Sequence, residues 1–188
     1  DAKATEAAFK GAAHVTKMDI VNNRLVPNPM EPRATLGVYD SAEDHYTCWT
    51  TSQNPHVARL VMSAFYNVAP ENKLRVIAPD VGGGFGSKIY IYPEEIVCLW
   101  ASKKTGVPVK WVSDRTEAFL TDAHGRDHVT HVELAFDKDH KMLGLKVDTI
   151  ANLGAYMSLF SSSVPTYLYA TLLSGQYDLK AIHANVRT

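Results

Sequence analysis

Residues 82–88 read Gly-Gly-Gly-Phe-Gly-Ser-Lys, and this run constrains the fold more than any other part of the 188-residue chain. Four glycines within five residues allow positive φ angles and let the backbone approach a group that a Cβ atom would exclude. An apolar segment, Lys73–Ala78, precedes the run, and a helical pattern begins after it at Pro93. We therefore expect a strand, a loop and a helix, with the loop backbone in close contact with something else.

The loop does not match the two common phosphate-binding motifs. A P-loop ends in Gly-Lys-Ser/Thr, whereas here Ser87 precedes Lys88 and Ile89 follows it. The dinucleotide pattern G-x-G-x-x-G is matched by Gly82 and Gly84 but has Ser87 in its third glycine position. A tight structural turn and a nest of N–H groups for an anion or oxo group both remain open. A nucleotide-phosphate binder is a further hypothesis, and calorimetry with ATP or NAD tests it.

Periodicity and turn signals predict an α+β fold with mixed sheets and two or three amphipathic helices. A connector with three prolines, Val26–Pro32, separates the first elements from the rest. Polar turns at 40–44 and 137–141 predict two hairpins. Strands are expected at 14–25, 34–39, 46–51, 73–78, 107–112, 128–136 and 142–151, with an unfinished strand at 183–187, and helices at 4–13, from Pro55, from Pro93 to Gly106, and at 114–120.

The two strongest helices are predicted to bury apolar stripes. Asn54 is the expected N-cap of the first, and Gly106 is the expected end of the second. Glu94 and Glu95 open the second helix, where acidic side chains interact favourably with the helix dipole. The expected stripes are Val57, Leu60, Val61, Ala64 and Phe65 in the first helix, and Ile96, Val97, Leu99 and Trp100 in the second.

Composition excludes several classes of function. The net charge is −1, without a basic run, which argues against nucleic acid and anionic membranes as partners. No apolar stretch is long enough to span a bilayer. Cys48 and Cys98 have no metal-binding spacing and are expected to be buried free thiols, which fits a cytoplasmic location. His128 and His131 lie three apart in a predicted strand, so they point to opposite faces and do not share a metal.

A second feature lies in Thr50-Thr-Ser-Gln-Asn-Pro-His56, where a strand ends and a helix begins. Gln53 has a neutral side chain that both donates and accepts hydrogen bonds. By itself the segment favours local capping and turn chemistry by Gln53 and Asn54 over a functional role. Lys88, at the far end of the glycine loop, either approaches a cofactor or solvates the end of the loop.

These segments together resemble the molybdopterin-binding large subunit of the xanthine dehydrogenase/aldehyde oxidase family, with the aerobic carbon monoxide dehydrogenase-like branch most similar. The resemblance covers about Val26 to Thr188. The motifs that carry it are Pro29-Met-Glu-Pro-Arg33, Ser52-Gln-Asn-Pro-His56, Lys73-Leu-Arg-Val-Ile-Ala-Pro-Asp-Val-Gly-Gly-Gly-Phe-Gly-Ser-Lys88, Gly106-Val-Pro-Val-Lys-Trp-Val-Ser-Asp-Arg115, Asn152-Leu-Gly-Ala-Tyr156 and Gly175-Gln-Tyr177.

The resemblance implies an oxidoreductase that inserts water-derived oxygen at a molybdenum–pterin centre. Gln53 matches the catalytic glutamine that hydrogen-bonds an oxygen ligand of the metal. Gly83, Gly84, Phe85 and Gly86 match the cofactor-binding backbone, and no side chain here ligates the metal directly. The implied cofactor is molybdopterin in its cytosine dinucleotide form. The implied partners are an iron–sulfur and an FAD-binding subunit or domain, in a dimer of heterotrimers, with a small-molecule substrate.

The resemblance also predicts what lies elsewhere. Many purine hydroxylases have a glutamate where this chain has Ile89, which disfavours a purine substrate. The arginine segment and the general-base glutamate fall after Thr188, so the chain is expected to be a fragment without activity or bound cofactor. Residues 1–25 are expected to lead in from a preceding domain, and residues 26–188 to begin the molybdopterin-binding domain. The alternative is a catalytically silent scaffold or binding domain with the same fold.

Overall fold

The computed structural model describes residues 1–188 and divides them into two compact units. The terminal unit comprises residues 1–25 and 126–188, and the insert unit comprises residues 26–125. The insert unit therefore interrupts the terminal unit in sequence. One of its boundaries is the proline connector, and the other falls between Gly125 and Arg126, where no composition signal predicted a division.

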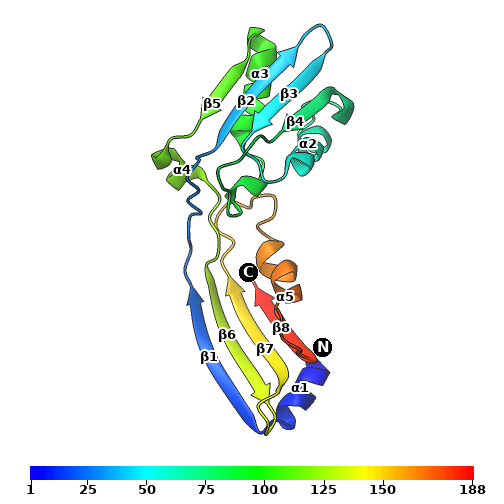
Figure 1. Cartoon of the computed structure of the whole chain (residues 1–188), viewed down its shortest axis with the longest axis vertical. Coiled ribbons are helices and arrows are strands. Elements are labelled where there is room, and N and C mark those ends of the chain that lie inside the picture. Colours follow the sequence, from blue (N-terminus) through cyan, green and yellow to red (C-terminus); the bar gives the residue numbers. More distant parts are fainter. The chain divides into compact units, whose positions relative to one another are not determined.

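The terminal unit is built on a four-stranded mixed sheet with the order β1-β6-β7-β8 (Figure 1). β1, β6 and β7 are antiparallel neighbours, whereas β8 runs parallel to β7. Its elements are α1 (Ala2–Lys10), β1 (His14–Asn22), β6 (His128–Phe136), β7 (Met142–Ala151), a π-helical turn (Val164–Leu168), α5 (Tyr169–Thr171) and β8 (Ala181–Arg187).

Local hydrogen bonds define the ends of these elements. The carboxylate of Asp1 accepts from the N–H groups of Lys3 and Ala4, which starts α1 earlier than the sequence predicted. The carboxylate of Asp137 accepts from the N–H groups of Asp139 and Lys141, which closes the predicted hairpin between β6 and β7.

The insert unit contains a second mixed sheet, with the order β4-β3-β2-β5. The predicted hairpin joins β2 to β3, and β4 lies parallel to β3. Its elements are β2 (Ala34–Asp40), β3 (His45–Thr50), α2 (Pro55–Ala64), a 3₁₀ turn (Glu71–Lys73), β4 (Leu74–Ile77), a second 3₁₀ turn (Ser87–Ile89), α3 (Pro93–Thr105), β5 (Val109–Val112) and α4 (Arg115–Thr121). The predicted α+β class with mixed sheets is confirmed.

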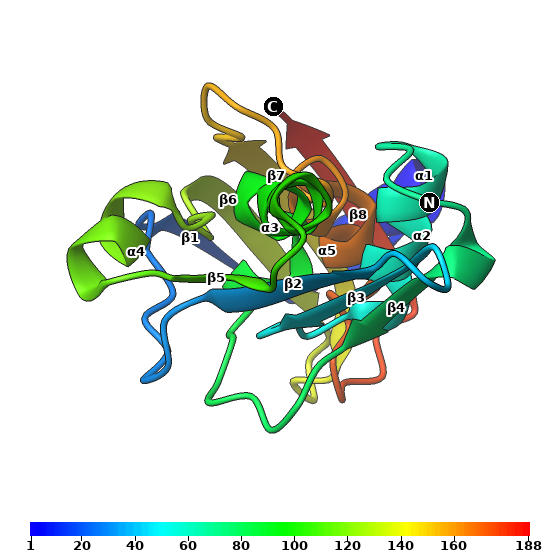
Figure 2. The same ribbon diagram turned by 90° about the horizontal axis from the view of Figure 1, so that it is seen from above.

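Helices α2 and α3 cover one face of this sheet (Figure 2). The core between them and the sheet contains Tyr46 and Cys48 of β3, Leu74 of β4, Met62 of α2 and Leu99 of α3. Gly37 of β2 allows the closest approach, because a Cβ atom there would lie 2.5 Å from the carbonyl carbon of Cys98. The loops that follow β3 and β4 therefore start from strands that pack on this core.

The apolar stripes were predicted partly wrongly. In α2 the buried residues are Ala58, Val61 and Met62, whereas Leu60 and Phe65 are exposed. α3 buries Glu95, Cys98, Leu99 and Ser102, and exposes Val97 and Trp100. For α3 the reason is the close helix–sheet approach at Gly37, which places the backbone of Cys98 and Leu99 against β2. Periodicity alone predicted that the larger apolar side chains would be the buried ones.

The predicted helix ends had different outcomes. Gly106 ends α3 in the left-handed conformation with φ +74°, as expected. The carboxylate of Asp114 caps α4 by accepting from the N–H of Glu117. Asn54 occupies the N-cap position of α2, but its side chain makes no capping hydrogen bond. Instead the hydroxyl of Ser52 accepts from the N–H of Asn54.

The remaining composition-based predictions concern thiols, metals and membranes. Cys48 and Cys98 are buried free thiols, as predicted. His128 and His131 pair with Ala151 and Asp148 of β7 and point to opposite faces of the sheet, and no cluster of potential metal ligands occurs in residues 1–188. None of the helices combines the length and apolar character that a membrane crossing requires.

Candidate functional site

The glycine loop bends sharply between β4 and the second 3₁₀ turn of the insert unit. Gly83 and Gly86 have φ angles of +91° and +95°, which only glycine adopts without strain. Phe85 between them also has a positive φ, +50°, and its side chain is 77% exposed. A bulky residue in this conformation is strained and commonly marks a functional segment.

Gln53 is attached to this loop at two points. Its backbone N–H donates to the carbonyl of Lys88 at 2.9 Å. Its side-chain Oε1 accepts from the backbone N–H of Gly86 at 3.0 Å. Because a backbone N–H only donates, the amide atom that faces Gly86 must be the oxygen. The Nε2 group of Gln53 consequently remains a donor for an oxygen atom of a ligand.

The backbone of the glycine loop lies very close to the side chain of Gln53. A Cβ atom on Gly84 would lie 2.2 Å from Oε1 of Gln53, so any side chain there would displace the Gln53 amide. No hydrogen bond within the chain uses the N–H groups of Gly83, Gly84 and Phe85. Three successive unused N–H groups next to an amide donor can bind the oxygen atoms of an oxyanion or of a metal–oxo group. The structure therefore brings together the five residues singled out from the sequence.

Glu31 and Lys88 form an ion pair at the ends of the glycine loop. The ammonium of Lys88 lies 2.7 Å from Oε2 of Glu31, and the Lys88 side chain is fully buried. Of the two alternatives left open for Lys88, the one in which it solvates the end of the loop is therefore wrong. The same carboxylate oxygen accepts from the N–H of Gly82 at 2.9 Å. Partial burial acts to raise the pKa of Glu31, but the hydrogen bonds from Lys88 and Gly82 outweigh it and lower that pKa.

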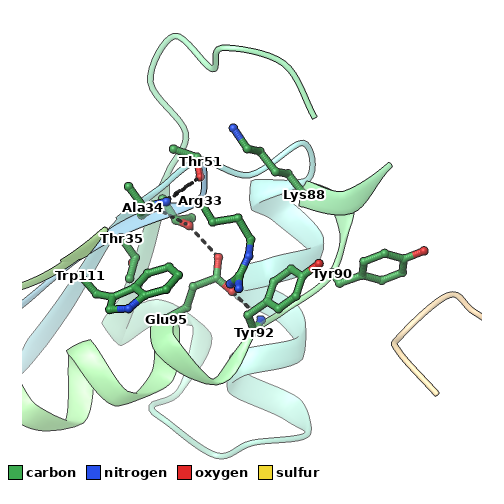
Figure 3. A pocket seen from close by; sticks show the side chains of 10 residues that line it. Arg33, Ala34, Thr35, Thr51, Lys88, Tyr90, Tyr92, Glu95 and Trp111 are labelled. Atoms are coloured by element: carbon green, nitrogen blue, oxygen red, sulfur yellow. Dashed lines mark hydrogen bonds between the residues drawn. The ribbon is translucent and has the colours of Figure 1, made fainter. Parts of the chain in front are cut away.

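A second polar cluster lies beside this ion pair, around Arg33 (Figure 3). The guanidinium donates to Asp122 at 2.6 Å and to Glu94 at 3.1 Å. It also stacks on the ring of Tyr92, 3.6 Å from the centroid, with Trp111 further away at 5.0 Å. A cavity of about 10 Å³, about the space of one water molecule, is lined by Arg33, Lys88 and Glu95 among others.

Glu95 of α3 is a further buried ionisable residue of this cluster. Its carboxylate accepts from the hydroxyl of Thr50 at 2.6 Å and from the N–H of Tyr92 at 2.9 Å. Burial raises the pKa of Glu95, against the opposing effect of these two hydrogen bonds. Glu94 thus pairs with Arg33, and Glu95 caps α3 through the N–H of Tyr92. Both roles come in addition to the predicted interaction with the helix dipole.

Sequence reasoning missed the partners of the loop. Glu31 and Arg33 lie in the segment Met-Glu-Pro-Arg. This segment is one of the motifs that carry the family resemblance, but the resemblance implied no role for either residue. The only available signal was the presence of both charges in a proline-rich connector, where neither has a local partner. Their partners come from other elements, namely Lys88 for Glu31 and Asp122 for Arg33.

Comparison with known proteins gives a consistent picture. The family described as the molybdopterin cofactor-binding domain matches residues 2–188. The carbon monoxide dehydrogenase large chain of Hydrogenophaga pseudoflava is 38% identical over the whole of this chain and 23% of its own length. The nicotine 6-hydroxylase large subunit of Paenarthrobacter nicotinovorans is 33% identical over 94% of this chain and 22% of its own length.

A solved structure supports the fold directly. The reconstituted CO dehydrogenase from Oligotropha carboxidovorans superimposes with a TM-score of 0.82 at 36% identity, covering 99% of this chain and 23% of that chain. The present chain thus spans about a quarter of the length of the relatives that it matches. With a family match over nearly every residue and the same fold, the chain belongs to the molybdopterin cofactor-binding domain family.

Proposed function

We propose that this chain is part of the catalytic large subunit of a molybdenum hydroxylase, and that Gln53 and residues 83–86 line its metal–oxo centre. The observation that carries the proposal is the orientation of the Gln53 amide. Its oxygen is engaged by Gly86, which leaves Nε2 to donate to an oxygen ligand. When bound, the molybdenum–pterin group supplies the redox step that transfers water-derived oxygen to the substrate.

The residues of this chain contribute orientation and hydrogen bonds. Gln53 holds an oxygen atom through its Nε2 donor, and the hydrogen bond from Gly86 prevents the amide from rotating. The unused N–H groups of Gly83, Gly84 and Phe85 supply further donors to oxygen atoms. The exposed ring of Phe85 supplies an apolar wall beside these donors. Preorganised donors of this kind need no rearrangement when charge develops on the bound oxygen.

The wider assignment follows from the relatives. They are named as a large chain or a large subunit, which supports the presence of partner subunits. We propose that these partners carry iron–sulfur clusters and FAD, in a dimer of heterotrimers located in the cytoplasm. The cofactor form is the cytosine dinucleotide. The substrate is carbon monoxide, an aldehyde or an N-heterocycle, with purines disfavoured by Ile89. The chain alone turns over no substrate, because it spans only 23% of such a subunit.

The test uses the full-length protein together with the subunits that copurify with it. Metal analysis should find molybdenum, and dye reduction should follow the addition of carbon monoxide, an aldehyde or an N-heterocycle. Gln53→Ala should reduce kcat on the order of 10²-fold, the usual effect of removing one preorganised donor. A protein without molybdenum, or one with unchanged turnover after Gln53→Ala, would contradict the proposal.

Gln53→Glu separates the donor role from the packing role. A glutamate still accepts from the N–H of Gly86 but cannot donate to a ligand oxygen. If Gln53 acts as a donor, Gln53→Glu is as slow as Gln53→Ala. If Gln53 only holds the loop, Gln53→Glu keeps the activity of the unmodified protein, and the assigned role is wrong.

A further inference from the structure

The two ends of the glycine loop are tied to one atom. Oε2 of Glu31 accepts from the N–H of Gly82, where the loop starts, at 2.9 Å, and from the ammonium of Lys88, where it ends, at 2.7 Å. A third hydrogen bond runs in the opposite sense, from the N–H of Glu31 to the carbonyl of Gly82 at 3.3 Å. The segment between these ends contains every backbone atom assigned to the metal–oxo centre.

Burial makes this arrangement strong. The side chain of Lys88 has no exposed surface, whereas that of Glu31 is 35% exposed. A buried ammonium without a partner is strongly unfavourable, so Lys88 cannot leave the carboxylate without cost. The contact at the other end is equally tight, because a Cβ atom on Gly82 would lie 2.6 Å from the Cβ of Glu31.

Lys88 also connects this pair to Gln53. Its carbonyl accepts from the backbone N–H of Gln53 at 2.9 Å, while Gly86, two residues earlier, holds the side chain of Gln53. A displacement of Lys88 therefore moves Gln53 through its backbone and through its side chain. Glu31 has no hydrogen bond to Gln53, and the side chain of Lys88 bonds Glu31, so only the backbone of Lys88 contacts Gln53.

We propose that Glu31 and Lys88 form a clamp of positioning residues, which holds the glycine loop and through it fixes the direction of the Gln53 amide. This inference rests on the proposed function, because it assigns the clamp to the same site. The clamp acts on the rate of the reaction and not on the capture of substrate, since it adjusts a donor whose hydrogen bond matters most when charge develops. Misplacement of such a group by about 1 Å costs on the order of 10²-fold in rate.

The experiment compares Lys88→Met and Glu31→Ala in the full-length protein with its copurifying subunits. Arg59→Met is the matched control, because it breaks the ion pair between Arg59 and Glu71 in the same unit. Both side chains of this pair are about half exposed. Both clamp variants should lower kcat by about 10²-fold with KM unchanged, whereas Arg59→Met should change neither. Glu31→Gln, which keeps an oxygen acceptor for both donors, should recover part of the activity that Glu31→Ala loses.

Combination with Gln53→Ala tests the route of action. If the clamp works through Gln53, Lys88→Met should cause little further loss in a Gln53→Ala background, whereas a general effect on folding would add to it. Hydrogen–deuterium exchange in the cofactor-free full-length protein gives a readout that is independent of turnover. The amides of Gly82 and Gly86 should exchange faster in both clamp variants, and those of β2 and β3 should be unchanged.

Each failure has its own signature. Normal kcat in Lys88→Met and Glu31→Ala, beside an impaired Gln53→Ala, overturns the clamp and leaves the proposed function standing. Fully additive losses in the double variant also overturn it. Unchanged turnover in Gln53→Ala removes the proposed role of Gln53 instead. If Lys88→Met does not fold, the comparison of Glu31→Gln with Glu31→Ala and the exchange rate at Gly82 still decide the question.

Discussion

A methyl group on Gly84 would lie 2.2 Å from Oε1 of Gln53, so the backbone of the glycine loop and this side chain leave no room between them for one carbon atom. The consequence is mutual: Gln53 restricts position 84 to glycine, and Gly84 restricts the side-chain conformation of Gln53. Gly84 therefore matters less for backbone flexibility than for the space that it leaves for the side-chain amide of Gln53.

Gly84→Ala should displace the side chain of Gln53 and break its hydrogen bond to Gly86. We expect kcat of the full-length protein to fall to about the level of Gln53→Ala, on the order of 10²-fold. Gly125→Ala is the control, because a Cβ atom there meets nothing within 4 Å. Steady-state dye reduction measures both, and normal activity in Gly84→Ala would show that the loop adjusts.

Gly37→Ala should separate α3 from β2, because the new Cβ atom would contact the backbone at Cys98 and not a movable side chain. Overpacking of this kind costs about 1–3 kcal/mol. Hydrogen–deuterium exchange of the α3 amides in the full-length protein should become faster, while exchange in the terminal unit stays the same. Unaltered protection of α3 would mean that the helix shifts without loss of stability.

Arg33→Met should destabilise the insert unit, because it leaves the carboxylates of Asp122 and Glu94 without their shared cation. Removal of one partner from a buried ion pair costs about 3–5 kcal/mol. Arg59→Met, which removes an exposed pair, should cost about 0–1 kcal/mol. Thermal unfolding of the two full-length variants measures the difference, and equal shifts in Tm would refute the assignment of a buried network.

Glu95→Gln should remove a pH dependence from the insert unit. The folded-state pKa of Glu95 is raised above its ordinary value of 4.5 by burial. The stability that it contributes is therefore fully present below pH 4.5 and is lost as the pH rises through the raised pKa. Glutamine keeps an acceptor for Tyr92 and can donate to the hydroxyl of Thr50, so its stability should not vary in that range. Exchange protection of β3 and α3, measured from pH 4.5 upward, should fall in the unmodified protein and stay constant in the variant.

Local features of this fold could be predicted from the sequence. The hairpin at 40–44, the end of α3 at Gly106 and the cap at Asp114 each depend on a few adjacent residues with a defined conformational preference. The faces of the helices were predicted less well, because Gly37, far away in sequence, decides which side of α3 is buried. The parallel pairs β3–β4 and β7–β8 were not predicted, since strand periodicity carries no information on partners.

The candidate site shows the same division. Gln53 and residues 83–86 were singled out because glycine spacing and a strand–helix junction are visible along the chain, and their proposed roles came from the family resemblance. The hydrogen bond between Gln53 and Gly86 supplied the direction of the amide, which no sequence pattern contains. The pairing of Glu31 with Lys88 was missed because it joins two segments that are separated by a complete β–α–β unit. Long-range ion pairs of this kind have no local signal.

The order of the strands in the terminal unit affects how the chain is made. Within residues 1–188 β1 pairs only with β6, with His14 opposite Phe136, so this pair forms only after the ribosome has synthesised the whole insert unit. Until then Met18 and Val21, which are exposed even in the finished sheet, belong to a nascent strand without its β6 partner. All strand pairs of the insert unit are internal to it, so it can fold first. Biosynthesis thus leaves the edge of β1 that pairs with β6 unpaired until translation reaches β6.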